Sequence, residues 1–206
     1  MMREMREGDQ CVLDVSEIPS YGFGHRSLMW WGTLGMVAIE GTVFALAIVV
    51  YFYVRTRVND WPPSVLPPEL IWGTANTVLM LLSLVPNQWT KRAAEAEDLP
   101  KVRIGLAIGV LFGAVFLVLR AFEFTALNCR WDTNAYGSAV WMLLSLHTIH
   151  VATDFFDTAV LSALMAFGPI EGKRFVDVSE NSFYWYFVVF AWIPIYAIIY
   201  FGARIL

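Results

Sequence analysis

Five long apolar segments dominate the sequence, and they restrict the folds that the chain can adopt. They lie at about residues 29–54, 69–89, 104–127, 136–167 and 183–203. Each reaches the length of about 20 residues that a helix needs to cross a bilayer. Segments of this kind are expected to be helices, because lipid cannot satisfy the open edge of a sheet. The sequence therefore predicts an all-α, polytopic membrane bundle with five transmembrane helices over residues 29–206, preceded by a segment of residues 1–28.

The composition excludes other broad classes of protein. Of the 206 residues, 58% are hydrophobic and only 16% are charged, whereas a soluble domain carries more charge. The net charge of -4 gives no reason to expect a nucleic-acid partner. A membrane partner or a membrane-embedded function is the expectation that remains.

Basic residues in the predicted loops indicate the orientation. The N-terminal segment and the loops on its side of the membrane carry nine of them, whereas the opposite side carries four. The nine are Arg3, Arg6, Arg26, Lys91, Arg92, Lys101, Arg103, Lys173 and Arg174, and the four are Arg55, Arg57, Arg130 and Arg204. The N-terminus is therefore predicted to be cytoplasmic.

The fourth apolar segment carries a stripe of polar residues. His147, His150, Asp154 and Asp157 fall within an arc of about 80° on a helix that turns 100° per residue. Ionisable groups are costly in lipid, so this stripe should face protein or water, and each member is a functional candidate. His150 and Asp154 are four residues apart, a spacing at which the two side chains can pair.

Glu40, in the first apolar segment, is a candidate partner for the histidines of the fourth segment. Helices one and four should run in opposite directions, and both Glu40 and His147 lie about 16 Å from the start of their own segment. The two residues should therefore have a similar depth near the middle of the membrane. The sequence predicts a contact between Glu40 and a histidine of the fourth segment.

The histidines are not expected to bind a metal or a haem. A metal site needs three or four converging ligands, and the third histidine, His25, lies outside the apolar segments. No ExxH motif of the di-iron type is present. We therefore predict no catalytic residue and no metal ligand, with the histidines joining helices. A haem-binding electron carrier and a stand-alone proton or solute transporter are the alternatives, although no inverted repeat supports the transporter.

Other polar residues are expected to link helices or to pair near the membrane surface. Arg120 and Glu123 can form an ion pair at a spacing of three residues, close to the outer end of the third segment. A salt bridge at the membrane interface is the simplest interpretation of this pair. Asn76, in the second segment, can form a hydrogen bond to another helix.

Aromatic and basic residues near the segment ends indicate contacts with lipid headgroups. Tryptophan is typical of the membrane interface, and basic side chains bind anionic headgroups. Most of the following tryptophans are expected to be interfacial: Trp30, Trp31, Trp89, Trp185 and Trp192. The lipid-binding candidates are Trp30, Trp31, Trp89, Lys91 and Arg92.

Five sequence blocks share their order and spacing with a known family. They read "WGTLGMVAIEGTVF", "ANTVLMLLSL", "RAFEF", "YGSAVWMLLSLHTIHV" and "YWYFVVFAW". Together they resemble subunit III of the haem–copper terminal oxidases, in its short five-helix bacterial form. The resemblance covers roughly residues 29–203.

The resemblance implies roles for particular residues and for the chain. It places Glu40 on a membrane-buried glutamate that reacts with carbodiimide reagents, Glu123 on a family glutamate, and His147 and His150 on the HxxH pair of the family. It implies a subunit of a bacterial inner-membrane oxidase that has no haem or copper of its own. Such a subunit packs against the catalytic subunit I in a complex that includes subunit II. It also binds phospholipid, supports proton uptake and protects the enzyme from inactivation during turnover.

The sequence also departs from the family pattern. Tyr186 stands where the family usually has a histidine, and Arg120 stands at a usual glutamine. Asp154 and Asp157 have no counterpart in the pattern. These differences leave a second partner open, because the chain could instead accompany a nitric-oxide reductase.

Overall fold

Five long helices form the structure, a computed structural model that describes residues 4–7, 10–13, 21–58, 61–63 and 66–205. The helices are α1 (Leu28–Arg55), α2 (Leu70–Glu95), α3 (Leu99–Thr125), α4 (Ala135–Phe167) and α5 (Gly172–Tyr196). All five, with α5 counted together with the short elements that follow it, are long and apolar enough to cross a membrane. The prediction of a helical membrane bundle with five spans is confirmed.

The helix ends follow from local chemistry. Side-chain oxygens of Ser27, Asp98 and Asn134 accept hydrogen bonds from backbone amides in the first turns of α1, α3 and α4. Such caps satisfy amides that have no partner inside the helix. Helices α1, α3 and α4 therefore start one to five residues before the apolar segments predicted from the sequence.

The end of α5 is irregular. Pro194 lies inside the helix, and a π-helix, η2 (Ala197–Gly202), begins three residues later and leads into α6 (Ala203–Ile205). Proline has no amide hydrogen for the helical ladder. A π-turn at this point is a common way for a helix to absorb such a disturbance.

The N-terminal segment adds the only strands in the described residues. β1 (Glu4–Glu7) and β2 (Gln10–Leu13) pair as an antiparallel hairpin, and a short 3₁₀ helix, η1 (Gly24–Arg26), precedes α1. The apolar periodicity gave no sign of this hairpin. The all-α prediction therefore holds for the membrane bundle, and the hairpin is an addition to it.

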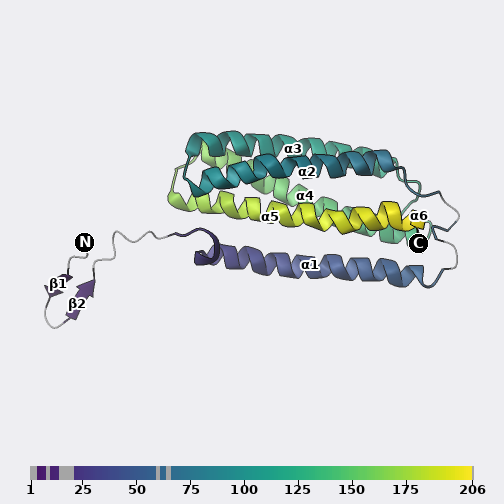
Figure 1. The fold of residues 1–206 in the computed structure, drawn as a ribbon, viewed down its shortest axis with the longest axis horizontal. Coiled ribbons are helices and arrows are strands. Elements are labelled where there is room, and N and C mark those ends of the chain that lie inside the picture. The colour runs from purple at the N-terminus through teal and green to yellow at the C-terminus, as the bar shows by residue number, and fades with distance from the viewer. Residues whose placement is uncertain (1–3, 8–9, 14–20, 59–60, 64–65, 206) are drawn as a thin grey trace.

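The helices are not equally embedded in the bundle. Helices α2, α3, α4 and α5 pack closely on one another, and α1 lies on one side, along α4 and α5 (Figure 1). Within α1 only Phe44, Ala47 and Tyr51 are buried, whereas twelve residues of α5 are. The core is therefore centred on α4 and α5, and α1 is attached to its flank.

Candidate functional site

An ion pair inside the bundle is the centre of the candidate site. Arg120 and Glu123 of α3 are each 1% exposed, and Arg120 Nη1 lies 2.9 Å from Glu123 Oε2. The guanidinium group also lies over the ring of Trp192 of α5, 4.1 Å from its centre. A charge buried in this way is tolerated only when a counter-charge and further polar contacts compensate it.

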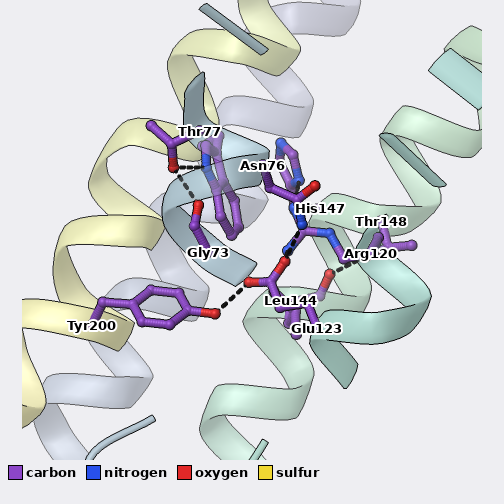
Figure 2. Close-up of polar contacts among 10 residues, drawn as sticks. Gly73, Asn76, Thr77, Arg120, Glu123, Leu144, His147, Thr148 and Tyr200 are labelled. Atoms are coloured by element: carbon purple, nitrogen blue, oxygen red, sulfur yellow. Dashed lines mark hydrogen bonds and ion pairs between the residues drawn. The ribbon is translucent and has the colours of Figure 1, made fainter. Parts of the chain in front are cut away.

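Two further helical segments donate hydrogen bonds to Glu123 of this ion pair (Figure 2). Asn76 of α2 donates a hydrogen bond to Glu123 Oε2, and Tyr200 of η2 donates one to Glu123 Oε1. The glutamate thus receives donors from α2, α3 and η2. Arg120 Nε and Asn76 Oδ1 are buried and have no hydrogen-bond partner among the described residues. The hydrogen-bonding capacity of these side chains is therefore only partly used.

His147 extends the network to α4, and its contacts define its tautomer. Its Nδ1 lies 3.3 Å from Arg120 Nη2, which can only donate, and its Nε2 lies 3.1 Å from the carbonyl oxygen of Val188, which can only accept. Nδ1 must therefore be the acceptor and Nε2 the donor. The imidazole is neutral in this arrangement and bridges α3 to α5.

This network revises one expectation from the sequence. Arg120 and Glu123 pair as predicted, but their side chains are enclosed by the bundle and do not extend from its surface. Both are buried with Asn76 and His147 among α2, α3, α4 and α5. We name the set Asn76, Arg120, Glu123, His147 and Tyr200 the central network. Tyr200 and the contacting Trp192 were not singled out as network residues from the sequence, since their roles depend on how α5 and η2 lie against α3.

A second polar contact joins α1 to the bundle. Glu40 Oε2 lies 3.7 Å from His150 Nε2 and accepts a hydrogen bond of 2.7 Å from the hydroxyl group of Tyr184 in α5. The depth argument predicted contact with a histidine, and the structure selects His150. The other ring nitrogen of His150 lies 2.7 Å from the carbonyl oxygen of Leu146. We name Glu40, His150 and Tyr184 the α1 contact.

The polar stripe of α4 is divided among different environments. His147 is buried in the central network, His150 faces Glu40, and Asp157 is exposed. Asp154 is buried, but none of the hydrogen bonds or ion pairs of the described residues joins it to His150, so the expected pairing of these two residues is absent. One face of a helix thus meets three different sets of neighbours.

An acidic groove lies between α1, α4 and α5, next to the α1 contact. Its volume is about 420 Å³, and its walls include Asp157, Asp177, Glu180 and Tyr184. Arg174 lies 3.8 Å from Asp177, whereas Glu180 is buried and its Oε2 has no hydrogen-bond partner among the described residues. The groove brings acids to the side of Tyr184, which donates to Glu40.

The tryptophans do not form a single belt. Trp185 and Trp192 are 8% and 1% exposed and belong to the core, so these two are not interfacial residues. Trp31 and Trp89 are exposed, as an interfacial position requires, and Trp30 stacks on Phe183 of α5. Burial was not visible in the sequence because both core tryptophans lie in the same apolar run as exposed residues.

The described residues contain no group of three or more His, Cys, Asp or Glu side chains in a metal-binding arrangement. The polar residues predicted as buried candidates fall into the central network, the α1 contact and the acidic groove, except Asp154, which lines a separate pocket. The structure therefore defines a polytopic membrane protein whose buried ionisable residues connect neighbouring helices.

Comparison with known proteins identifies the family. The family model of cytochrome c oxidase subunit III matches residues 29–204. A probable cytochrome c oxidase subunit 3 from Nocardia farcinica is 28% identical over 177 residues, which are 82% of this chain and 86% of that protein. The cytochrome c oxidase subunit 3 of Thermostichus vulcanus is 24% identical over 181 residues, which are 87% of this chain and 90% of that protein.

The match extends from α1 to the last turn of the bundle. The chain therefore belongs to the cytochrome c oxidase subunit III family, as a divergent member with low identity to these relatives. The family resemblance inferred from the five sequence blocks is confirmed.

Proposed function

We propose that this chain is a non-catalytic accessory subunit of a respiratory haem–copper oxidase. It packs against the catalytic subunit I, in a complex that also contains subunit II, in the bacterial inner membrane. The match to the subunit III family over residues 29–204 is the observation that carries this proposal, because it includes all five helices. The haem and copper that reduce oxygen belong to the partner subunits.

The central network supports a structural role for the buried polar groups. It ties α2, α3, α4 and η2 together through two charges and three neutral polar side chains. Polar contacts of this kind add to van der Waals packing between helices in lipid, where the hydrophobic effect does not drive helices together. In our proposal the network keeps the bundle in the one packing that subunit I recognises.

Phospholipid binding is the second part of the proposal. A groove of about 530 Å³ is lined by Leu84, Val85, Trp89, Arg92 and Tyr186, among others. Its apolar wall suits an acyl chain, and the guanidinium group of Arg92 suits a lipid phosphate. This groove brings two of the lipid-binding candidates from the sequence, Trp89 and Arg92, into one place.

The acidic groove supports a role in proton uptake. Asp157 and Asp177 provide carboxyl groups at the end of the bundle where the α2–α3 and α4–α5 connections and the start of α1 lie (Figure 1). The loop charges predict that this end, with residues 1–28, is cytoplasmic. Carboxyl groups at that surface are placed to collect protons for the partner that consumes them.

Purification of the complete complex tests the proposal. An affinity tag on this chain, extraction in a mild detergent and mass spectrometry should recover subunits I and II, with an optical spectrum that contains a-type or o-type haem. Recovery of a nitric-oxide reductase would support the other partner considered from the sequence. Transport activity of the chain alone in liposomes, or a haem spectrum of the chain alone, would contradict the proposal.

A further inference from the structure

A pocket with polar residues in its wall lies inside the bundle, and no role described above uses it. It is formed where α2, α3, α4 and α5 meet, and the space that the centre of a water molecule can occupy there is about 40 Å³. Its walls include the glycines Gly105, Gly109 and Gly113, which follow a GxxxGxxxG spacing on α3. A Cβ atom at Gly105 would lie 2.1 Å from Thr90 Oγ1 of α2, and one at Gly113 would lie 2.8 Å from Cδ2 of Phe155 in α4, so the glycines permit the close approach of both helices.

Asp154 is the ionisable residue of this pocket. It is 4% exposed, and its Oδ1 has no hydrogen-bond partner among the described residues. An isolated buried carboxyl oxygen without a partner is costly, since it has exchanged its hydration for an environment that provides no donor. The hydroxyl group of Thr158 lies beside the carboxyl group, but Oδ1 remains open to a further donor.

The charged and titratable groups around Asp154 do not include a cation that could be this donor. His150, one turn before Asp154, directs its ring nitrogens to Leu146 and Glu40. Asp157 on α4 and Tyr184 and Glu180 on α5 add no positive charge. Helix α3 has no titratable side chain between residues 104 and 119. A neutral donor small enough for the pocket is needed.

The pocket has the polar partners that a bound water molecule needs. Asn87 donates to the carbonyl oxygen of Ser182, which leaves its own amide oxygen as an acceptor, and Asn181 has the same capacity. A buried water molecule typically makes two to four such contacts.

The pocket also borders the acidic groove. Asn181 lines both, and its amide donates a hydrogen bond of 2.9 Å to Thr158 Oγ1, a residue of the pocket wall. This bond lies at the boundary between Asp154 and the groove. A rotation of the Asn181 side chain would connect the two spaces.

We propose that this pocket is a hydration site in which up to about three water molecules bind the carboxyl group of Asp154, with Asn181 as the gate to the acidic groove. The volume accommodates this number, since one water molecule needs roughly 10–15 Å³ by the same measure. The inference stands apart from the partner proposed above, because it depends only on residues of this chain.

High-resolution electron cryomicroscopy of the complex purified through this chain tests the proposal directly. The expected result is density for ordered water within hydrogen-bonding distance of Asp154 in the wild-type protein. Asp154→Asn, which keeps a polar side chain of the same shape, should retain the water. Asp154→Leu should lose it. A pocket without density in the wild-type protein would overturn the proposal.

A second readout does not need a folded Asp154→Leu variant. Brief radiolysis forms hydroxyl radicals from water, and mass spectrometry then locates the oxidised side chains. Trp185 lines the pocket and Trp192 lies against the central network, and both are buried, so they form a matched pair. Trp185 should be oxidised several times more than Trp192. Equal oxidation of the two would show a dry pocket and would refute the hydration site.

Discussion

The central network and the α1 contact both place a glutamate beside a histidine-bearing helix, but they differ in burial and in closeness. In the central network the ion-pair atoms are 2.9 Å apart and both side chains are 1% exposed. In the α1 contact Glu40 and His150 are 3.7 Å apart, and Glu40 is 24% exposed. The first contact joins helices of the core, and the second attaches a helix at the flank.

This difference shows how neighbours determine the energetic weight of a polar pair. The side chains of Arg120 and Glu123 are almost fully buried, so each depends on the other, and Glu123 also depends on donors from α2 and η2. Glu40 keeps part of its exposure and has the hydroxyl group of Tyr184 as a second partner. We therefore expect substitutions in the central network to affect stability, and substitutions in the α1 contact to affect reactivity.

Removal of one charge from the central network should have the largest effect. Glu123→Gln keeps the shape of the side chain but leaves Arg120 buried without its counter-charge, which should lower the free energy of unfolding by about 3–5 kcal/mol. Denaturant titration in detergent, followed by circular dichroism, measures this change. Asp132→Asn is the control, because it breaks the exposed Arg130–Asp132 pair and should leave the stability nearly unchanged. Similar losses of unfolding free energy in both variants would show that the buried pair is no more important for stability than the exposed one.

Gly73→Ala tests how tightly α2 approaches the central network. A Cβ atom at Gly73 would lie 2.3 Å from Cζ of Tyr200, so the tyrosine must shift away from Glu123. Overpacking of this kind costs about 1–3 kcal/mol. Gly35→Ala on α1 has no atom within 4 Å of the new Cβ and should be neutral or slightly stabilising. The same unfolding titration compares them, and an equal response would show that α2 is no closer to its neighbours than α1.

His147 tests the hydrogen-bonded bridge between α3 and α5. His147→Leu removes the acceptor for Arg120 and the donor to Val188, and should cost about 1–3 kcal/mol of unfolding free energy. His147→Gln retains one donor and one acceptor on its amide and should lose less. If glutamine and leucine were equally destabilising, packing of the ring rather than its hydrogen bonds would explain the role of His147.

Loss of the α1 contact should change the reactivity of Glu40 towards carbodiimides. Carbodiimides react with a protonated carboxyl group, and the imidazole of His150 is the basic side chain beside Glu40. His150→Leu should increase labelling of Glu40 by up to about fivefold, which corresponds to the roughly 1 kcal/mol of a partly exposed ion pair. Mass spectrometry of labelled peptides measures the rate. His147→Gln is the control and should not change it, whereas an unchanged rate in His150→Leu would exclude the contact.

The smallest effect should come from an exposed pair outside the bundle core. The side-chain hydrogen bond and the charge of Lys101 lower the pKa of Asp98, which caps α3. The folded pKa lies below the unfolded one, so this contribution to stability is present above the unfolded pKa and is lost as the pH falls through the folded pKa. Amide exchange in the first turn of α3 should rise over that range. Asp98→Asn should keep the cap and lose the pH dependence.

Several features of the candidate site were predictable from the sequence. Glu40, His147 and His150 were recognised as candidates because ionisable groups in apolar segments are rare. The pairing of Arg120 with Glu123 followed from their spacing on one helix. The depth of these residues relative to one another followed from the rise of a helix, which is constant.

Other features depended on contacts between distant segments. The sequence could not show that Tyr200 and Asn76 meet at Glu123, because these residues come from three helical elements. It could not separate buried Asp154 from exposed Asp157, since both lie on one face of α4. The GxxxGxxxG spacing of α3 is present in the sequence and is a signal of close helix packing. The spacing alone does not show which helices approach these glycines, and the structure identifies them as α2 and α4.

The sequence by itself determined that this protein is a bundle of five membrane helices and that it belongs to the subunit III family, because span length and motif order are properties of the chain. Only the tertiary structure decided which polar residues form ion pairs, which form hydrogen bonds and which line a pocket. The physical reason is that the free energy of a buried polar group depends on the donors, acceptors and solvent within a few ångströms of it. Those neighbours are set by how the helices pack.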